Sequence, residues 1–212
     1  MSFDRTRSAR KEGRYEPDLS DLPALVADTL LGQVAFVREN QPMVIPTAVA
    51  FEPPDALLVH GSTGSGWMRW LATGVPAAVS ITALDALVVA RSAFESSMRY
   101  RSAVLFGTFE VVEEERAKRA ALDLITDTLI PGRVAEVREP TAKELSATMV
   151  LRLRIEDATV KTNSEAWPDD PDEDVAGDAW AGIVPRLTSY DDAQPAPDLR
   201  AGIAEPPSVT GL

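Results

Sequence analysis

The sequence of 212 residues contains no cysteine and only one histidine, His60. Without cysteine the chain cannot form disulfides, thiolate zinc sites, iron–sulfur clusters or a thiol nucleophile. His60 is then the only position at which imidazole chemistry is available, and this excludes most hydrolase and metalloenzyme mechanisms. We therefore expect no metal-ion site in this chain.

Positive charge is also scarce, because 21 lysines and arginines stand against 33 acidic residues and give a formal net charge of −12. A nucleic-acid partner requires a basic face, so we expect none. The N-terminal residues mix both charge signs without an apolar segment, and no run long enough to span a membrane follows. This pattern favours neither a secretory signal nor a membrane anchor, and the expected location is the cytoplasm.

The acidic charge is concentrated at the C-terminal end. Residues 165–212 carry 11 acidic and 2 basic side chains and seven of the 16 prolines. Proline lacks the backbone N–H that a continuous helix or a central strand needs. We therefore divide the chain into a polar N-terminal arm over 1–19, a folded domain over 20–164, an acidic proline-rich strap packing on that domain over 165–190, and a disordered tail over 191–212.

The folded domain alternates short apolar runs with helical patterns. Capping and stop signals predict helices over 20–32 and 65–74, and an apolar face preceded by three glutamates predicts a longer one over 113–130. Strand-like runs between turn formers predict a six-stranded antiparallel barrel, and a last strand pair is expected within 148–163, with a break at Glu156. The six runs span 33–38, 43–52, 56–61, 76–85, 86–93 and 101–112. The predicted class is mainly β with flanking helices.

Two stretches carry groups that suit an anion. Residues 60–69 read HGSTGSGWMR, where glycines and hydroxyls lead from a strand into a helix and Arg69 follows one turn later. Residues 96–107 read SSMRYRSAVLFG, with Tyr100 and Arg101 at the mouth of a buried strand. The first stretch is also compatible with an ordinary glycine-serine turn, and the second with ion pairing to the acidic excess.

Two aromatic side chains also have two interpretations each. His60, at a strand end, is either a hydrogen-bonded wall residue or an acid or base near a ligand. Trp180 lies in the acidic strap, within DAWAGIVPR. A side chain this large either clamps the strap to the barrel or forms one wall of a cofactor pocket.

Five segments, in order and spacing, resemble the flavin-binding split barrels related to pyridoxamine 5'-phosphate oxidase, in the branch that includes nitroimidazole-resistance proteins. They read VIPTAVAF, LLVHGSTGSG, ALVVARSAFESSMRYRSAVLFG, VKTNSEAWPDDPDED and WAGIVPR. The similarity runs from about Thr6 to Pro185. It implies a six-stranded antiparallel split barrel of the FMN-binding type, and a homodimer that holds two FMN molecules between its subunits.

The resemblance also implies which residues contact FMN. The strand 46–49 would line the isoalloxazine ring, 60–69 would surround the phosphate or ribityl chain, and 100–102 would close the site from either subunit. His60, followed by Tyr100, is the candidate for a catalytic acid or base near the ring. The implied cofactor-binding residues are Pro46, Thr47, Ala48, Val49, His60, Gly61, Ser62, Ser65, Arg69, Tyr100, Arg101, Ser102 and Trp180.

The chain differs from true pyridoxamine phosphate oxidases at three of their motifs. The flavin strand reads TAVAF instead of a basic sequence, the phosphate turn reads SGWMR, and no histidine accompanies Trp180. We therefore expect an FMN-dependent oxidoreductase acting on an unidentified small molecule, and not a pyridoxamine phosphate oxidase. Two alternatives stay open: a non-catalytic flavin-binding or sequestering protein, and a split barrel that binds deazaflavin or haem instead of FMN.

Overall fold

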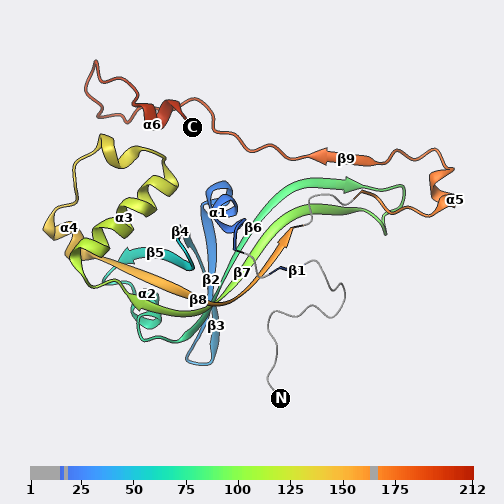
Figure 1. The fold of residues 1–212 in the computed structure, drawn as a ribbon. Helices are drawn as coiled ribbons and strands as arrows, with labels where there is room; N and C mark the ends of the chain where they lie inside the picture. Colours follow the sequence, from blue (N-terminus) through green and yellow to red (C-terminus); the bar gives the residue numbers. More distant parts are fainter. Residues whose placement is uncertain (1–14, 17–18, 163–166) are drawn as a thin grey trace.

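The computed structural model describes residues 15–16, 19–162 and 167–212, and its centre is one antiparallel sheet (Figure 1). Hydrogen-bonded neighbours follow the order β3-β2-β6-β7-β8-β5-β4, while β1 pairs with β8 and β9 pairs with β6. The path does not close, because β3 and β4 stay at its two ends. The strands are β1 (Tyr15–Glu16), β2 (Leu31–Arg38), β3 (Gln41–Ala48), β4 (Ala50–Glu52), β5 (Ala56–Ser62), β6 (Pro76–Val89), β7 (Ser97–Val111), β8 (Thr148–Thr162) and β9 (Gly182–Pro185).

The predicted class, mainly β with an open antiparallel barrel, is confirmed, but the strand boundaries differ. The run over 43–52 divides at Val49 into β3 and β4, and the backbone N–H of Val49 donates to Leu30 instead. The runs over 76–85 and 86–93 join into the single strand β6, and the expected pair over 148–163 is the single strand β8. The path therefore has seven strands instead of six.

Two β-bulges explain why these breaks in pattern do not end the strands. Asp85 is the extra residue between the pairs Leu84↔Tyr100 and Ala86↔Arg99. Glu156 is the extra residue where β7 and β8 shift register next to Gly107. A bulge bends its strand and re-aims the side chains around it. The acidic residues that interrupt the apolar alternation in the sequence are therefore the bulged residues themselves.

The main core fills the interior of the open barrel. Side chains at alternate positions of each strand point inward, as the period of two requires. Helix α1 (Leu22–Thr29) closes one part of this core with Leu22, Leu25 and Val26, and α2 (Gly66–Leu71) contributes Met68 and Leu71. These five side chains are at most 2% exposed.

A second, smaller core lies on the outer face of the sheet. Helix α3 (Glu115–Leu129) packs Ala121 and Ile125 against Leu58 of β5 and Val150 of β8. Its first turn is capped by Glu114, whose carboxylate accepts hydrogen bonds from the backbone N–H groups of Arg116 and Ala117. The 3-10 helix η1 (Arg133–Glu136) and α4 (Ala142–Ala147) follow, and they connect α3 to β8.

Strands β6 and β7 continue beyond the barrel as a long arm, and the C-terminal strap runs along it (Figure 1). Near the tip, Arg91 forms an ion pair with Asp170, 3.0 Å between Nη1 and Oδ2, and the Asp170 side chain is only 1% exposed. The short helix α5 (Asp172–Val175) follows, and β9 then pairs with β6 over Ala86–Val89. The strap is thus fastened to the arm at two places.

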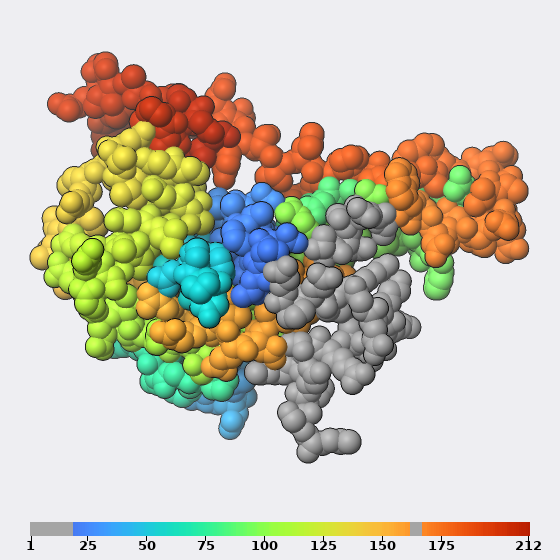
Figure 2. All heavy atoms as spheres, viewed as in Figure 1, coloured from blue at the N-terminus to red at the C-terminus, as the bar shows by residue number. Residues whose placement is uncertain are grey.

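The segment 191–212, for which the sequence predicts disorder, is described by the structure. Figure 2 shows its red end lying against the yellow region that includes η1. There α6 (Pro207–Thr210) places Ser208 against Glu136, and the Ser208 backbone N–H lies 3.0 Å from Oε1 of that carboxylate. The predicted N-terminal arm falls largely outside the described residues. No helix of the described part of the chain is long and apolar enough to cross a bilayer.

Candidate functional site

Arg101, the cation at the centre of the stretch 96–107, is held by two carboxylates. Its Nη1 lies 2.8 Å from Oδ2 of Asp28 on α1, and its Nη2 lies 2.8 Å from Oδ1 of Asp85 in the β6 bulge. The hydrogen bond to Asp85, followed by that to Asp28, raises the pKa of Arg101 above its ordinary value. Ion pairing was one of the two interpretations that the sequence allowed for this stretch. A contact between Arg101 and a cofactor stays a prediction.

A cavity of about 620 Å³ lies beside this ion-pair cluster, and we call it the Arg101 cavity. It is enclosed by the end of α1, by β2 and β6, and by the strap that follows β9. Arg186 contributes a second cation, and its backbone N–H donates to the carbonyl of Asp85 at 2.8 Å. Polar donors therefore surround a space of ligand size. The lining residues are Ala27, Asp28, Thr29, Leu31, Gln33, Thr82, Ala83, Leu84, Asp85, Arg101, Arg186, Thr188 and Tyr190.

Tyr100 and Ser102 point to the other side of β7. Their partners across the ladder are Leu84 and Thr82 on β6, and Ser102 also faces Lys161 on β8. The Lys161 ammonium donates to the Tyr100 hydroxyl and lies 4.1 Å from the centre of the Tyr100 ring. This lysine, which sequence analysis did not single out, therefore places a positive charge on the outer face of the sheet.

The predicted flavin strand 46–49 is divided between the two faces. Pro46 is exposed and pairs with Gln33 on β2, so it shares the outer face with Ser102. Ala48 lies two residues further along that face. Thr47 points toward the interior, and Val49 is completely buried. A Cβ on Gly32 would lie only 2.7 Å from Val49, so this packing requires glycine at position 32. Only the outward residues offer side chains to a ligand.

Three backbone N–H groups in the turn between β5 and α2 already donate hydrogen bonds within the protein. The N–H of Thr63 donates to Ala147, that of Gly64 to the Ser62 hydroxyl, and that of Ser65 to the Ser62 carbonyl. Gly61 lies against Met68, because a Cβ added to this glycine would be 3.2 Å from Cγ of the methionine. Arg69 is exposed on α2. The predicted phosphate cradle therefore has fewer unengaged N–H groups than its glycine-rich sequence indicates.

His60 points away from this turn, toward α3. It is on the same face of β5 as Leu58, and its ladder partner is Val150. Its ring is partly buried, and Nδ1 is buried without a hydrogen-bond partner among the described residues. Burial lowers the pKa of His60 from its ordinary value of 6.5, so the ring is neutral near pH 7. A buried, neutral imidazole with an unsatisfied nitrogen is available for a ligand.

A two-lobed space adjoins His60, and we call it the His60 hollow. One lobe, of about 490 Å³, is lined by His60 and Thr148 of the sheet and by Glu144 of α4. The other, of about 400 Å³, lies further along α3. The two lobes share apolar and polar lining from α3 and the segment after η1. The shared residues are Leu122, Thr126, Val137, Arg138 and Pro140.

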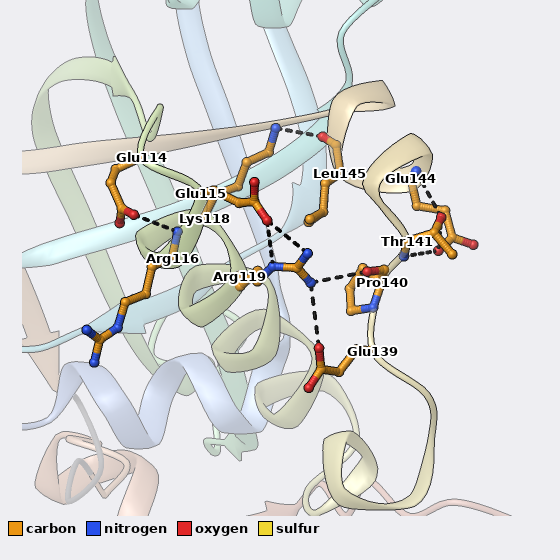
Figure 3. Close-up of polar contacts among 10 residues, drawn as sticks. All are labelled: Glu114, Glu115, Arg116, Lys118, Arg119, Glu139, Pro140, Thr141, Glu144 and Leu145. Atoms are coloured by element: carbon orange, nitrogen blue, oxygen red, sulfur yellow. Dashed lines mark hydrogen bonds and ion pairs between the residues drawn. The ribbon is translucent and has the colours of Figure 1, made fainter.

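The outer wall of the His60 hollow is the segment from Glu139 to Leu145, and polar contacts hold this segment against α3 (Figure 3). Arg119 pairs with Glu115 at 3.0 Å and donates to the carbonyl of Pro140 at 3.1 Å. Lys118 donates to the carbonyl of Leu145 at 2.7 Å. Thr141 and Glu144 form a capping box at the start of α4. The wall is thus held by α3 side chains and by its own cap.

Trp180 lies neither on the barrel nor in one of these two spaces. It is 66% exposed and stacks on Gly182 at the start of β9, where a Cβ would meet its ring at 2.9 Å. A different tryptophan, Trp167, adds a further contact between strap and arm, with the Arg99 guanidinium 5.3 Å from its ring centre. The sequence signal for this contact was the same as for Trp180, an aromatic residue in an acidic strap.

The structure therefore separates the predicted site residues into groups. Pro46, Ala48, Tyr100 and Ser102 share the outer face of the sheet, Arg101 lies at the Arg101 cavity, and His60 lies at the His60 hollow. Sequence reasoning missed Asp85, Lys161 and Arg138. Asp85 had a signal, because an aspartate within the apolar run TALDALVV breaks the alternation of a strand. Arg138 had none, since no local pattern links it to His60.

Comparison with known proteins assigns the family. The sequence model of the pyridoxamine 5'-phosphate oxidase family matches residues 18–162. An FAD- and haem-binding protein from Mycobacterium smegmatis is 51% identical, with 93% of this chain and 96% of that chain covered and a TM-score of 0.87. The flavocytochrome Anf3 from Azotobacter vinelandii is 30% identical, with 99% and 96% covered and a TM-score of 0.88.

A more distant likeness concerns the fold alone. A protein assigned to 5-nitroimidazole antibiotic resistance from Bacteroides thetaiotaomicron is 21% identical over 69% of this chain and 85% of its own, with a TM-score of 0.59. Among curated proteins, no sequence matches. The family match covers more than half of the chain, and the two structures from Mycobacterium and Azotobacter share almost its whole length. The chain therefore belongs to the pyridoxamine 5'-phosphate oxidase family of split-barrel proteins.

Proposed function

We propose that this protein binds a flavin and a haem and works as an oxidoreductase that passes electrons between them. The observation that carries the proposal is the 51% identity, over almost the whole of both chains, with an FAD- and haem-binding protein. The similarity to a flavocytochrome supports it. The proposed flavin is therefore FAD, and FMN, which the family resemblance implied, is the alternative that the experiment below distinguishes.

Haem fits this chain at His60. We assign His60 as the iron ligand, because it is the only imidazole in a sequence that also holds no cysteine. Its buried Nδ1, which has no partner among the described residues, and its lowered pKa suit a neutral ligand nitrogen. Leu122 and Val137 of the adjoining hollow would contact the porphyrin. A bound haem would supply one-electron chemistry at its iron.

A flavin fits a different part of the molecule, the Arg101 cavity. The Arg101 cavity offers Arg186, Gln33 and Thr82 as donors for the phosphate and ribityl oxygens. Next to it, the outer sheet face presents Pro46, Ser102 and Tyr100 on one side. The charge of Arg101 is already offset by Asp28 and Asp85. Arg101 would therefore orient the donors of the cavity rather than bind the phosphate itself.

A homodimer is part of the proposal. The outer face of β2 and β3 carries Leu31, Val37 and Val44, which are 51%, 58% and 60% exposed. Exposed apolar side chains gathered on one face favour association with a second copy. The same face carries Pro46 and Ala48, so association would complete the flavin site. Sedimentation at micromolar concentration tests this, and a monomeric species would contradict it.

The absorbance spectrum of the purified full-length protein tests the cofactor proposal. We expect flavin bands together with a Soret band, and chromatography of the released flavin to identify FAD. Flavin bands alone would contradict the haem part, and a protein that takes up only a deazaflavin would contradict both parts. Bleaching by a nicotinamide donor, followed by turnover with an acceptor, separates an enzyme from a flavin carrier.

A further inference from the structure

Arg138 is one of the residues shared by both lobes of the His60 hollow. Its side chain is 67% exposed, whereas His60 is only partly exposed, so Arg138 lies at the rim and His60 deeper in the hollow. The polar groups of a haem are arranged in a matching way, because the iron lies within an apolar macrocycle and the two carboxylates lie at one edge of it. The hollow thus offers a ligand for the iron inside and a cation for a carboxylate at its opening.

We propose that Arg138 binds a carboxylate of the haem, and that it exchanges its present partner, Glu144, for that carboxylate when the cofactor enters. The proposal rests on the proposed function and names a residue that would position the cofactor. Arg138 now pairs with Glu144 through both terminal nitrogens, at 2.8 Å and 2.6 Å. A fork-shaped pair of this kind has the geometry in which a guanidinium binds any carboxylate.

Arg119, another cation of the hollow, is already engaged elsewhere. It is 31% exposed and connects Glu115 with the carbonyl of Pro140, so its loss would remove one of the contacts that hold the wall to α3. Among the described residues, the partners of Arg138 are Glu144 and the neighbouring carbonyl of Glu139, and neither connects the wall to α3. Moving Arg138 therefore leaves the wall in place.

Glu144 also keeps its structural role when Arg138 leaves. Its carboxylate accepts hydrogen bonds from the backbone N–H and the hydroxyl of Thr141, at 2.8 Å and 2.9 Å. The bond from the Thr141 N–H, together with the one that the Glu144 N–H donates to the Thr141 hydroxyl oxygen, forms the capping box of α4. Glu144 is thus a competitor for Arg138 that does not depend on it. The substitution Glu144→Gln would retain the capping box and lose the competing charge.

The test is a Soret titration of the full-length protein with free haem. Arg138→Gln should weaken haem binding about twofold to fivefold, the scale of one exposed ion pair. Glu144→Gln should strengthen it about twofold to fivefold, because Arg138 is released from an exposed ion pair. Arg154→Gln is the matched control: Arg154 is also 67% exposed and paired with a glutamate, Glu110, but lies outside the hollow.

Haem dimethyl ester separates charge recognition from general damage to the site. The ester retains the iron and the macrocycle but lacks both carboxylates, so Arg138→Gln should bind it as tightly as the wild-type protein does. Equal haem affinity of Arg138→Gln and wild type, with binding lost in His60→Ala, would overturn this inference and leave the proposed function intact. No Soret band in the wild-type protein would overturn both.

Discussion

The Arg101 cavity and the His60 hollow lie in different parts of the fold, and they treat their central polar group in opposite ways. Arg101 has a carboxylate partner on each side, one from α1 and one from the β6 bulge. His60 has a buried nitrogen without a partner in the described part of the chain, beside apolar lining. A satisfied cation contributes to the scaffold, whereas an unsatisfied buried nitrogen has a cost that a ligand can relieve.

This difference concerns how far local composition indicates the place of a binding site. The stretch 96–107 is rich in charged and hydroxyl groups, yet its central arginine is paired with two carboxylates of the protein. The hollow around His60 is assembled from a strand end, a helix and a distant loop, and only one of its polar residues stood out in the sequence.

The substitution His60→Ala should have the largest effect. Since no other histidine or cysteine exists in the sequence, we expect the Soret band to disappear from the purified protein. The flavin bands should stay, because the Arg101 cavity does not include His60. Absorbance spectra of the two proteins measure both at once. Loss of both cofactors would mean that the two sites are not separate.

Arg101→Met is the second test. The side chain is 29% exposed and its removal leaves Asp28 and Asp85 without this cation, so the free energy of unfolding should fall by about 1.5–3 kcal/mol. Urea denaturation measures this. Arg154→Met, which removes a single exposed ion pair to Glu110, should cost less than about 1 kcal/mol.

Arg101→Met also tests whether Arg101 contacts the flavin directly or serves only to pair Asp28 and Asp85. Flavin affinity, measured far below the unfolding transition, should change by less than about threefold if the guanidinium serves Asp28 and Asp85. A loss of tenfold or more, about 1.4 kcal/mol, would instead restore Arg101 to the direct cofactor contacts.

The sequence sufficed for the architecture because its signals are local. Alternating apolar residues give the strands, and the apolar face of 113–130 gives α3, whose observed bounds are Glu115–Leu129. The strand ends predicted at Asp85 and Glu156 were wrong, because a bulge and a strand end interrupt the alternation of apolar residues in the same way. Only the partner strand, which continues through both positions, distinguishes them.

The candidate site was predicted in part for a similar reason. The register places Pro46, Ser102 and Tyr100 on one face and turns Thr47 and Arg101 to the other, and their contacts with a cofactor stay a prediction. Which face a residue takes depends on register, and a shift of one position reverses it. Arg138 and His60 are far apart in sequence and meet only because α3 packs on β5 and β8.

Truncation after Tyr190 should have a smaller effect than the substitution at Arg101. It removes the hydrogen bonds of Ser208 to Glu136, so the free energy of unfolding should fall by less than in Arg101→Met. Tyr190, the last strap residue at the Arg101 cavity, is retained. Both cofactors should therefore stay bound, as spectra of the truncated protein would show. Loss of the Soret band would indicate that α6 supports the His60 hollow through η1.

The smallest expected effect is a pH dependence that belongs to the His60 hollow alone. Burial lowers the pKa of His60 in the folded state below its ordinary 6.5, so between these two values the unfolded chain binds more protons. The contribution to stability is complete above about pH 6.5 and is lost as the pH falls toward the folded-state pKa. Arg101 does not titrate in this range. We expect the cofactor-free wild-type protein to lose more stability than His60→Gln between about pH 7.5 and about pH 5.5 in urea denaturation. The carboxylates common to both proteins cancel in this difference, and parallel losses would show that the imidazole is not desolvated in the fold.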